Sequence, residues 1–470
     1  MSDIYYQKLK SLTDSGRLQT YIIIAPPRTN SSVVEHALGN SPDIDSECHE
    51  PFLNVRHENF DPDHGYRQIY ESVGGEQFEM SGENMSVVVK EMSHWIGKNE
   101  EYKRLAELTT KPVLILVRNP LLAVESRLRR VLATMDMRYN IDLQRHLLDE
   151  TAIERGFQNW NELAEKMERE GYKERFDFLP GKEGIERIYD TPVLTVQNHL
   201  LDRKAHKNNY ANWRDMVEKK LHGERDYAFF DGILRSNARR LGFEKDEFKK
   251  LAEEVQYLNE KNREVLVFDT TDLRAAPQEQ MQEMCDRLGI NFSPEMIRWG
   301  EKPVDFHTEQ EKQSERLWYD TLYSSSRINP PTEIPPTLDR FPEFMQTYLK
   351  SNNLPIYAEL SKKKILTAEL RHELNEREFQ VKVTDDNKEY LRELGLIESG
   401  AEAGERILIK LKHIDPIYAV SNEPKLIEQS EFQVSRARYE NEIKIVSDVI
   451  SENDEHTREI KGGGGEIKFR

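Results

Sequence analysis

Four short apolar runs constrain the fold of this chain more than any other feature of its sequence. They are rich in β-branched residues, and they lack the alternation with polar residues that marks a strand with one exposed face. Such runs are typical of strands buried on both faces, as in a parallel sheet covered by helices. The four runs are Tyr21–Ala25, Ser86–Lys90, Pro112–Val117 and Glu264–Phe268.

Helical patterns lie between these runs. The alternation of strands with helices predicts an α/β fold, a three-layer sandwich around a central parallel sheet. A further short run, Thr191–Gln197, is a candidate for one more strand. The predicted helices are Ser31–Leu38, Glu101–Leu108, Leu121–Met135 and Pro277–Leu288.

Changes of composition along the chain predict its domains. A charged, helical stretch at about 140–263 is expected to be an insertion that caps the strand ends, and the α/β domain as a whole is expected to cover 1–360. The mildly acidic remainder, 361–470, is predicted to be a small α+β domain to which the sequence assigns no role. Its end, about 452–470, contains the glycine run Gly462–Gly465 and is predicted to be flexible.

Composition argues against several classes of function. The 470-residue chain has a formal net charge of -18, whereas general nucleic-acid binding needs a basic surface. No apolar run is long enough to span a membrane, and the first residues lack the apolar core of a signal peptide. Two distant cysteines, Cys48 and Cys285, form no disulfide framework. We therefore expect a cytoplasmic protein without a nucleic-acid or membrane partner.

The loop after the first strand, "APPRTNSS", has the position of a phosphate-binding loop but not the usual composition. No glycine occurs between Gly16 and Gly39, so the loop matches neither a Walker A motif nor a dinucleotide motif. It instead offers Arg28, neutral donors, and two serines suited to cap the N-terminus of a helix, where unpaired N–H groups favour anions. An ordinary capped helix with an exposed arginine is the alternative. The neutral donors are Thr29, Asn30, Ser31 and Ser32.

A second stretch, "VRNPLLAVES", favours the anion site. Arg118 follows a buried strand, and Ser126 lies within the next helix. An arginine at the carboxyl end of a strand faces the crevice in which open α/β sheets bind their ligands.

Together, Pro27–Ser32 and the pair Arg118 and Ser126 resemble the two nucleotide-binding motifs of the P-loop-like sulfotransferases that use 3'-phosphoadenosine 5'-phosphosulfate (PAPS). The segments Cys48–Phe52, Val87–Trp95, Glu264–Trp299 and Leu317–Pro331 are similar to bacterial members, so that the resemblance covers about 18–355. It implies a P-loop NTPase-like fold and no metal. It also implies that Arg28, Thr29, Asn30, Ser31 and Ser32 bind the 5'-phosphosulfate, while Arg118 and Ser126 bind the 3'-phosphate.

The sequence departs from this family at two positions. Asn30 replaces the glycine of the first motif, which puts the closeness of the loop to the sulfate in question. Met92 stands where the best-known cytosolic eukaryotic members carry a catalytic histidine, and a methionine cannot accept a proton.

Glu50 is the residue that we favour as the catalytic base, because it is expected near a strand end that faces the same crevice. His49 is the alternative, since an imidazole titrates near neutrality. Lys90, expected at the end of its strand, is a candidate to stabilise charge on the bridging oxygen, or a partner in a buried ion pair with Glu50, or both. His94 and Trp95 are expected either to line the acceptor pocket or to belong to the core.

The sequence therefore predicts a PAPS-dependent sulfotransferase that acts on a hydroxyl or amine of a small molecule. One alternative is a nucleotide-dependent kinase with a degenerate loop. Another is a non-catalytic nucleotide-binding relative that acts through its C-terminal domain. That domain is also a candidate to contact a carrier protein or a second copy of the chain.

Overall fold

The computed structural model describes a defined set of residues, to which every structural statement below refers. They are 3–53, 63–93, 104–133, 149, 152–154, 156–159, 162–163, 165–166, 201–202, 204–236, 247–300, 304, 306, 319, 321–331, 335–366, 368–384, 388, 391–392, 396–398 and 400–410.

Within these residues, five strands form one parallel sheet in the order β2-β3-β1-β4-β5. The four apolar runs are all strands, which confirms the α/β prediction, and a short strand before Glu50 joins them. The candidate strand Thr191–Gln197 lies outside the described residues. The strands are β1 (Leu18–Ala25), β2 (Ser46–His49), β3 (Met85–Met92), β4 (Val113–Val117) and β5 (Val265–Asp269).

Strand β1 lies at the centre of the sheet, with β3 on one side and β4 on the other. Ile23 pairs with Lys90 of β3 and with Leu114 of β4. The chain fills the β2–β3 side of the sheet first and then crosses to the β4–β5 side, so its order reverses at β1. Such a reversal, at the carboxyl ends of the strands, is the usual ligand position in open α/β sheets.

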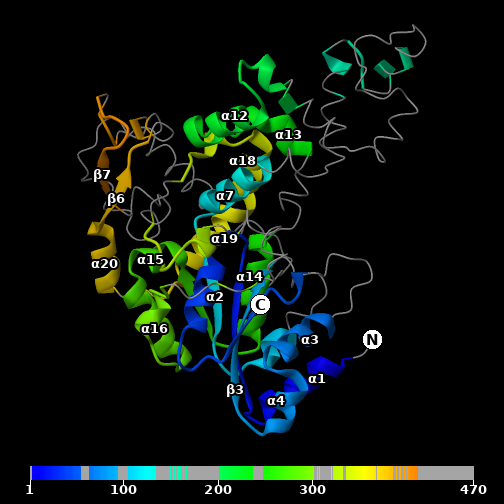
Figure 1. Cartoon of the computed structure of the whole chain (residues 1–470), viewed down its shortest axis with the longest axis vertical. Helices are drawn as coiled ribbons and strands as arrows, with labels where there is room; N and C mark the ends of the chain where they lie inside the picture. The colour runs from blue at the N-terminus through cyan, green and yellow to red at the C-terminus, as the bar shows by residue number, and fades with distance from the viewer. Residues whose placement is uncertain are drawn as a thin grey trace, which may run out of the picture.

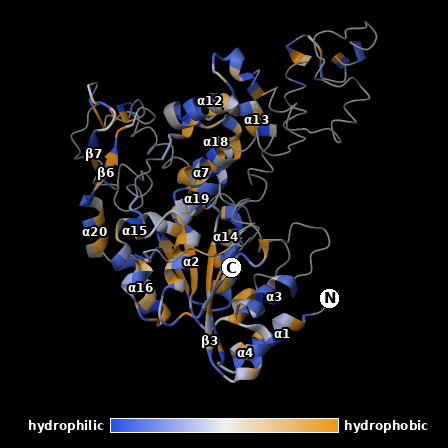
Figure 2. Ribbon diagram, in the orientation of Figure 1, coloured by the Kyte–Doolittle hydropathy of each residue, from blue (hydrophilic) through white to orange (hydrophobic). Residues whose placement is uncertain are grey.

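Two separate hydrophobic clusters cover the two faces of the sheet. Alternate residues of β1 enter different clusters, Ile22 and Ile24 on one face, Tyr21 and Ile23 on the other. Helices α1, α3, α7, α14 and α19 contribute to the first cluster, and α2, α15 and α16 to the second. The sheet is therefore the middle layer of three, and it forms the apolar centre of the molecule (Figures 1 and 2).

Three of the four predicted helices agree closely with the structure. Of the fourth, Glu101–Leu108, only the part from Arg104 onward is described, and it ends as a 3₁₀ turn, η2 (Ala106–Leu108). The helices of the sandwich are α1 (Ile4–Asp14), α2 (Ser31–Gly39), α3 (Asp63–Ser72), α4 (Gly75–Ser81), α7 (Pro120–Ala133), α14 (Glu247–Glu260), α15 (Thr270–Ala275), α16 (Pro277–Leu288), α18 (Glu343–Tyr348) and α19 (Leu354–Ser361). Shorter turns are η6 (Pro294–Met296), η7 (Leu338–Arg340) and η8 (Leu349–Asn353).

Within the predicted insertion, residues 204–236 pack on α7, beyond the carboxyl ends of the strands (Figure 1), whereas α14 belongs to the sandwich. The buried Glu125 of α7 accepts two hydrogen bonds from Arg225, at 2.7 and 2.6 Å, and Tyr227 also donates to it. The indole of Trp213 donates to the carbonyl of Leu132 at the end of α7. Its elements are α12 (Trp213–Glu218), η3 (Lys219–Glu224), η4 (Ala228–Phe230) and α13 (Asp231–Ser236).

After α19 the chain runs beside the outer strand of the sheet. Lys364 forms a parallel bridge with Val267 of β5, and the N–H of Ile365 donates to the Val267 carbonyl at 2.7 Å. A small hydrophobic cluster follows, which also includes Ala275 and Ala276 of the α15–α16 junction. Its elements are α20 (Ala368–Glu376) and the antiparallel pair β6 (Glu378–Lys382) and β7 (Arg406–Lys410).

Candidate functional site

The loop between β1 and α2 adopts a backbone that side chains rarely allow. Arg28 and Asn30 both have positive φ, 66° and 60°. Glycine adopts this left-handed conformation without strain, and asparagine tolerates it better than most other residues. Asn30 therefore adopts a backbone conformation that a glycine would adopt without strain.

Asn30, rather than a serine, is the residue that precedes α2, so the predicted serine caps are wrong. Its side chain makes no capping bond to the helix. Ser31 and Ser32 instead form the first turn, whose N–H groups have no acceptor within the helix. The amide nitrogen Nδ2 of Asn30 is buried and makes no hydrogen bond. The start of α2 thus offers several donors in one place.

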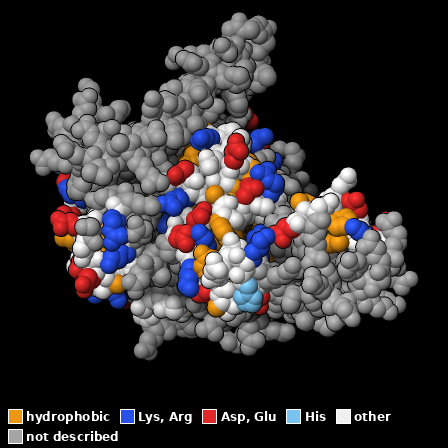
Figure 3. All heavy atoms as spheres, turned by 90° about the horizontal axis from the view of Figure 1, so that it is seen from above, with side chains coloured by type: hydrophobic (Ala, Val, Ile, Leu, Met, Phe, Trp, Pro, Cys, Tyr) orange, Lys and Arg blue, Asp and Glu red, His pale blue; other side chains and the backbone are white. Residues whose placement is uncertain are grey.

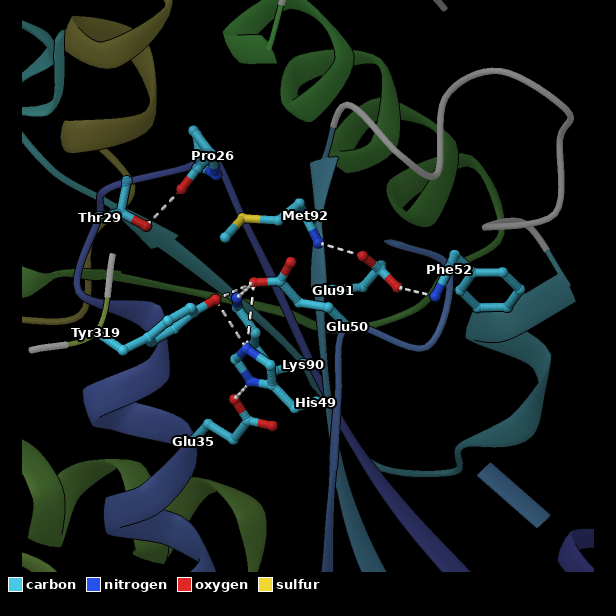
Figure 4. A network of polar contacts seen from close by, with 10 residues as sticks. All are labelled: Pro26, Thr29, Glu35, His49, Glu50, Phe52, Lys90, Glu91, Met92 and Tyr319. Atoms are coloured by element: carbon cyan, nitrogen blue, oxygen red, sulfur yellow. Dashed lines mark hydrogen bonds and ion pairs between the residues drawn. The ribbon is translucent and has the colours of Figure 1, made fainter. Parts of the chain in front are cut away.

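Thr29 makes a hydrogen bond within the loop itself. Its side chain is fully buried, and its hydroxyl donates to the Pro26 carbonyl at 2.7 Å (Figure 4). The hydroxyl therefore closes the loop on itself in this structure.

The two motifs that lie far apart in the sequence meet at this loop. The Nε of Arg28 donates to the hydroxyl of Ser126 at 3.0 Å. The Nη1 of Arg118 donates to the backbone carbonyl of Arg28 at 3.0 Å. Arg118 follows β4, only 5% of its surface is exposed, and Ser126 lies in α7. The structure therefore brings two arginines, a serine hydroxyl and the start of α2 to one point.

Glu50 lies directly after β2, as predicted, and it also has a positive φ, 46°. Its N–H donates to the carbonyl of Lys90 at 2.8 Å, and its carboxylate forms an ion pair with the ammonium of Lys90. Lys90 does not end its strand, because β3 continues to Met92, but the predicted pair with Glu50 is formed. Strained backbone at three residues of one small region is typical of functional sites.

Glu50 and Lys90 are both buried, with exposed fractions of 5% and 0%. Burial raises the pKa of Glu50, but the attraction of the Lys90 ammonium and hydrogen bonds from Lys90 and Tyr319 outweigh it, and the pKa falls to about 2. Glu50 is thus a carboxylate at neutral pH, the form that can accept a proton.

Glu91 lies beside Lys90 on the opposite face of β3. Its carboxyl accepts hydrogen bonds from the N–H groups of Phe52 and Met92, each at 2.8 Å (Figure 4). Burial, assisted by the charge of Glu50, raises the pKa of Glu91 to about 8. This contact ties the turn after β2 to the end of β3.

His49 is enclosed by side chains that the sequence analysis did not identify. Its Nδ1 lies 2.5 Å from Oε2 of the fully buried Glu35, and its Nε2 lies 3.0 Å from the hydroxyl of Tyr319. The ring of Phe306 stacks on the imidazole at 4.4 Å. Burial and the Lys90 charge lower the pKa of His49 to about 3, so the imidazole is neutral at physiological pH.

Other sequence predictions find no test here. His94 and Trp95 lie outside the described residues. Among those that are described, no group of three or more His, Cys, Asp and Glu side chains is arranged to hold a metal ion. No described helix combines the length and the apolar character that crossing a membrane requires.

The second half of the sandwich matches a known family. Residues 250–363 match the family model of a sulfotransferase domain. This match supports a sulfotransferase assignment for that part of the chain. No curated protein and no solved structure matches the chain.

The matched residues extend from α14 to just after α19 and include Tyr319. Their strand β5 pairs with β4, with Val117 opposite Asp269. The matched residues therefore belong to the same sheet as β1 and β2, the strands that precede the loop and Glu50. The sequence resemblance through Glu264–Trp299 and Leu317–Pro331 lies within this matched part.

Proposed function

We propose that this sulfotransferase transfers the sulfonate group of PAPS to a hydroxyl or amine of a small-molecule acceptor. One observation carries the proposal: Arg28 of the first motif contacts Ser126 of the second, while Arg118 donates to the Arg28 carbonyl. Two cationic side chains that converge at the start of a helix suit a ligand with several phosphate or sulfonate groups.

The donors at this point fit such a ligand. The Nδ2 of Asn30 is buried without an acceptor, and α2 begins without a side-chain cap. Arg28, Asn30, Ser31 and Ser32 are the residues that we assign to the 5'-phosphosulfate, with the buried Thr29 shaping their loop. To the 3'-phosphate we assign Arg118 and Ser126.

Glu50 and Lys90 provide the groups that the transfer requires. The reaction breaks the bond between sulfur and the phosphate oxygen, forms a bond from sulfur to the acceptor, and releases the acceptor's proton. The Glu50 carboxylate is in the form that accepts this proton, and the Lys90 ammonium can stabilise negative charge on the departing phosphate oxygen. This formed pair favours a catalytic protein over a non-catalytic relative.

The acceptor and the setting of the enzyme are part of the same proposal. Because Glu50 is buried, an acceptor has to insert a slender group to reach it, which favours a small molecule. The P-loop-like topology, a capping role for the insertion and a separate C-terminal domain remain proposals from the sequence, as does a cytoplasmic setting. Contact of that domain with a carrier protein or a second copy also remains a proposal.

The experiment is a binding and transfer assay on the full chain. We expect 3'-phosphoadenosine 5'-phosphate to bind the wild type in calorimetry, and labelled sulfonate to pass from PAPS to members of an acceptor panel. Arg118→Ala should weaken nucleotide binding at least about tenfold, because hydrogen bonds to charged groups contribute about 1.5–3 kcal/mol. Arg287→Ala is the matched control, since Arg287 lies on the outside of α16 and pairs with Glu283.

Two results would contradict the proposal. The first is a wild-type protein that does not bind 3'-phosphoadenosine 5'-phosphate. The second is magnesium-dependent turnover of ATP, which has no 3'-phosphate and would identify a kinase with a degenerate loop.

A further inference from the structure

A continuous chain of hydrogen bonds connects Glu35 with Glu50 (Figure 4). His49 lies between them, with Nδ1 at 2.5 Å from Glu35 and Nε2 at 3.0 Å from the Tyr319 hydroxyl. The Tyr319 hydroxyl donates to Oε1 of Glu50 at 3.2 Å. Oε1 of Glu50 also contacts the Lys90 ammonium.

The chain is assembled from four separate parts of the fold, and its two carboxyl groups and Lys90 are buried. Glu35 lies in α2, His49 ends β2, Lys90 lies in β3, and Tyr319 comes from the matched part of the sulfotransferase domain. Both Glu35 and Lys90 are completely buried. In such a site each donor needs an acceptor within the protein, so the protonation of one group constrains the next.

If the imidazole is neutral, the direction of the hydrogen bond between Tyr319 and Glu50 determines the directions of the two bonds that His49 makes. The Tyr319 hydroxyl gives its proton to Glu50, so its oxygen can accept from the N–H at Nε2 of His49. Nδ1 of His49 is then the acceptor, and Glu35 has to supply the proton between them. Every bond in the chain then has one donor and one acceptor.

The electrostatics of the site agree with this assignment. Burial raises the pKa of Glu35 well above its ordinary range, and the carboxylates of Glu47 and Glu50 add to the effect, against the cation of Lys90 and the nearby His36. Burial and Lys90 lower the pKa of His49 to about 3. Burial also raises the pKa of Tyr319.

We propose that Glu35 and Tyr319 are positioning residues for the sulfonyl transfer. Glu35, as a carboxylic acid, donates to Nδ1 of His49 and holds the tautomer whose Nε2–H points to Tyr319. The Tyr319 hydroxyl in turn orients the Glu50 carboxylate. Glu50 is then the base, and His49 donates a hydrogen bond to the Tyr319 hydroxyl that orients it. This inference rests on the proposed function for its kinetic part only.

The test combines histidine NMR with kinetics on the full chain. In protein labelled with ¹⁵N-histidine, the His49 signals are assigned by comparison with His49→Asn. We expect a neutral imidazole protonated at Nε2 between pH 6 and 8. Glutamine also donates a hydrogen bond through its amide, so Glu35→Gln should keep this tautomer and keep kcat within about threefold of the wild type. Glu35→Leu should lose both the Nε2-protonated tautomer and the wild-type kcat.

The kinetic readout separates positioning from binding. Glu35→Leu and Tyr319→Phe should each lower kcat about tenfold, the effect of one lost buried hydrogen bond, while the affinity for 3'-phosphoadenosine 5'-phosphate is unchanged. Tyr323→Phe is the matched control, because its ring lies beside that of Tyr319, at 5.9 Å, but outside the chain of bonds.

Three results would overturn the inference: an imidazolium or an Nδ1-protonated His49 in the wild type, a loss in Glu35→Gln as large as in Glu35→Leu, or a wild-type rate in Tyr319→Phe. If no acceptor is sulfonated at all, the proposed function fails, and the NMR spectra still decide the state of His49 and Glu35.

Discussion

At the scale of single residues, Asn30 combines two properties that a glycine cannot. Its φ of 60° gives the loop a glycine-like backbone, and its buried Nδ2 adds a donor that has no partner among the described residues. The sequence alone raised the question of whether this side chain contacts the ligand or only tolerates the backbone. The structure provides the means for both roles.

Two substitutions separate these roles. Asn30→Gly keeps the backbone and removes the amide, so the free energy of unfolding should stay within about 0.5 kcal/mol of the wild type, while 3'-phosphoadenosine 5'-phosphate binds about tenfold more weakly. Asn30→Ala should also lose about 1 kcal/mol of stability, because alanine is strained at positive φ. Urea unfolding and calorimetry measure the two effects. If Asn30→Gly binds the nucleotide with wild-type affinity, the Asn30 amide does not contact it.

Residue types and spacing identified the candidate site only in part. Arg28, Arg118 and Ser126 could be found because their order and spacing resemble known motifs. Glu35 could not, because it lies among apolar residues of a helix with no local pattern around it. Tyr319 lies 270 positions from His49, a separation that no short motif covers. The positive φ of Glu50 also has no signal in the sequence.

At the scale of elements, Glu91 links two neighbouring strands. Its carboxyl on β3 holds the N–H of Phe52, so the turn that carries Glu50 is fixed to the adjacent strand. The acid is buried, and burial raises its pKa from 4.5 to about 8. The burial of Glu91 therefore makes the stability of the protein depend on pH.

The sign of that dependence follows from proton binding. Between pH 4.5 and 8 the folded protein keeps the Glu91 proton that the unfolded chain has lost, so stability falls as pH rises. We expect the free energy of unfolding to fall more steeply in the wild type than in Glu91→Gln, by about 1.4 kcal/mol per pH unit for one full proton. Urea unfolding at several values between pH 5.5 and 7.5 measures it. The exposed Glu76→Gln should keep the wild-type slope, and equal slopes in all three proteins would refute the assignment.

The strands were the most predictable elements. Each apolar run became a strand because burial on both faces favours apolar residues at successive positions, and this pattern can be recognised in the local sequence. The short strand Ser46–His49 has no such run, since three of its four residues are only partly buried. Its place at the edge of the sheet comes from pairing with β3, which local sequence does not record.

At the scale of the whole molecule, the site draws together distant parts of one core. Arg28, Glu50, Arg118 and Tyr319 come from distant parts of the chain, so they separate when the sandwich unfolds. A ligand that binds only the assembled site should therefore stabilise the entire sandwich. At a 3'-phosphoadenosine 5'-phosphate concentration of 100 times the Kd, we expect a gain of about 2.7 kcal/mol in the free energy of unfolding.

Urea unfolding with and without the nucleotide measures this gain. Arg118→Ala should show little of it at the same concentration, whereas Arg287→Ala should show all of it. A gain of equal size in Arg118→Ala would place the nucleotide elsewhere on the protein.

The bridge between Val267 and Lys364 has a consequence for how the molecule behaves in a crowded solution. Strand β5 is the last of its sheet, and an uncovered outer strand is a template on which another chain can add. Lys364 and Ile365 occupy that edge, and Lys364 is locked there by a buried ion pair with Asp272 at 2.9 Å. The few residues after α19 thus cover the edge of β5 and oppose self-association. A chain shortened before them would expose this edge and would lose the cation that pairs with the buried Asp272 carboxylate.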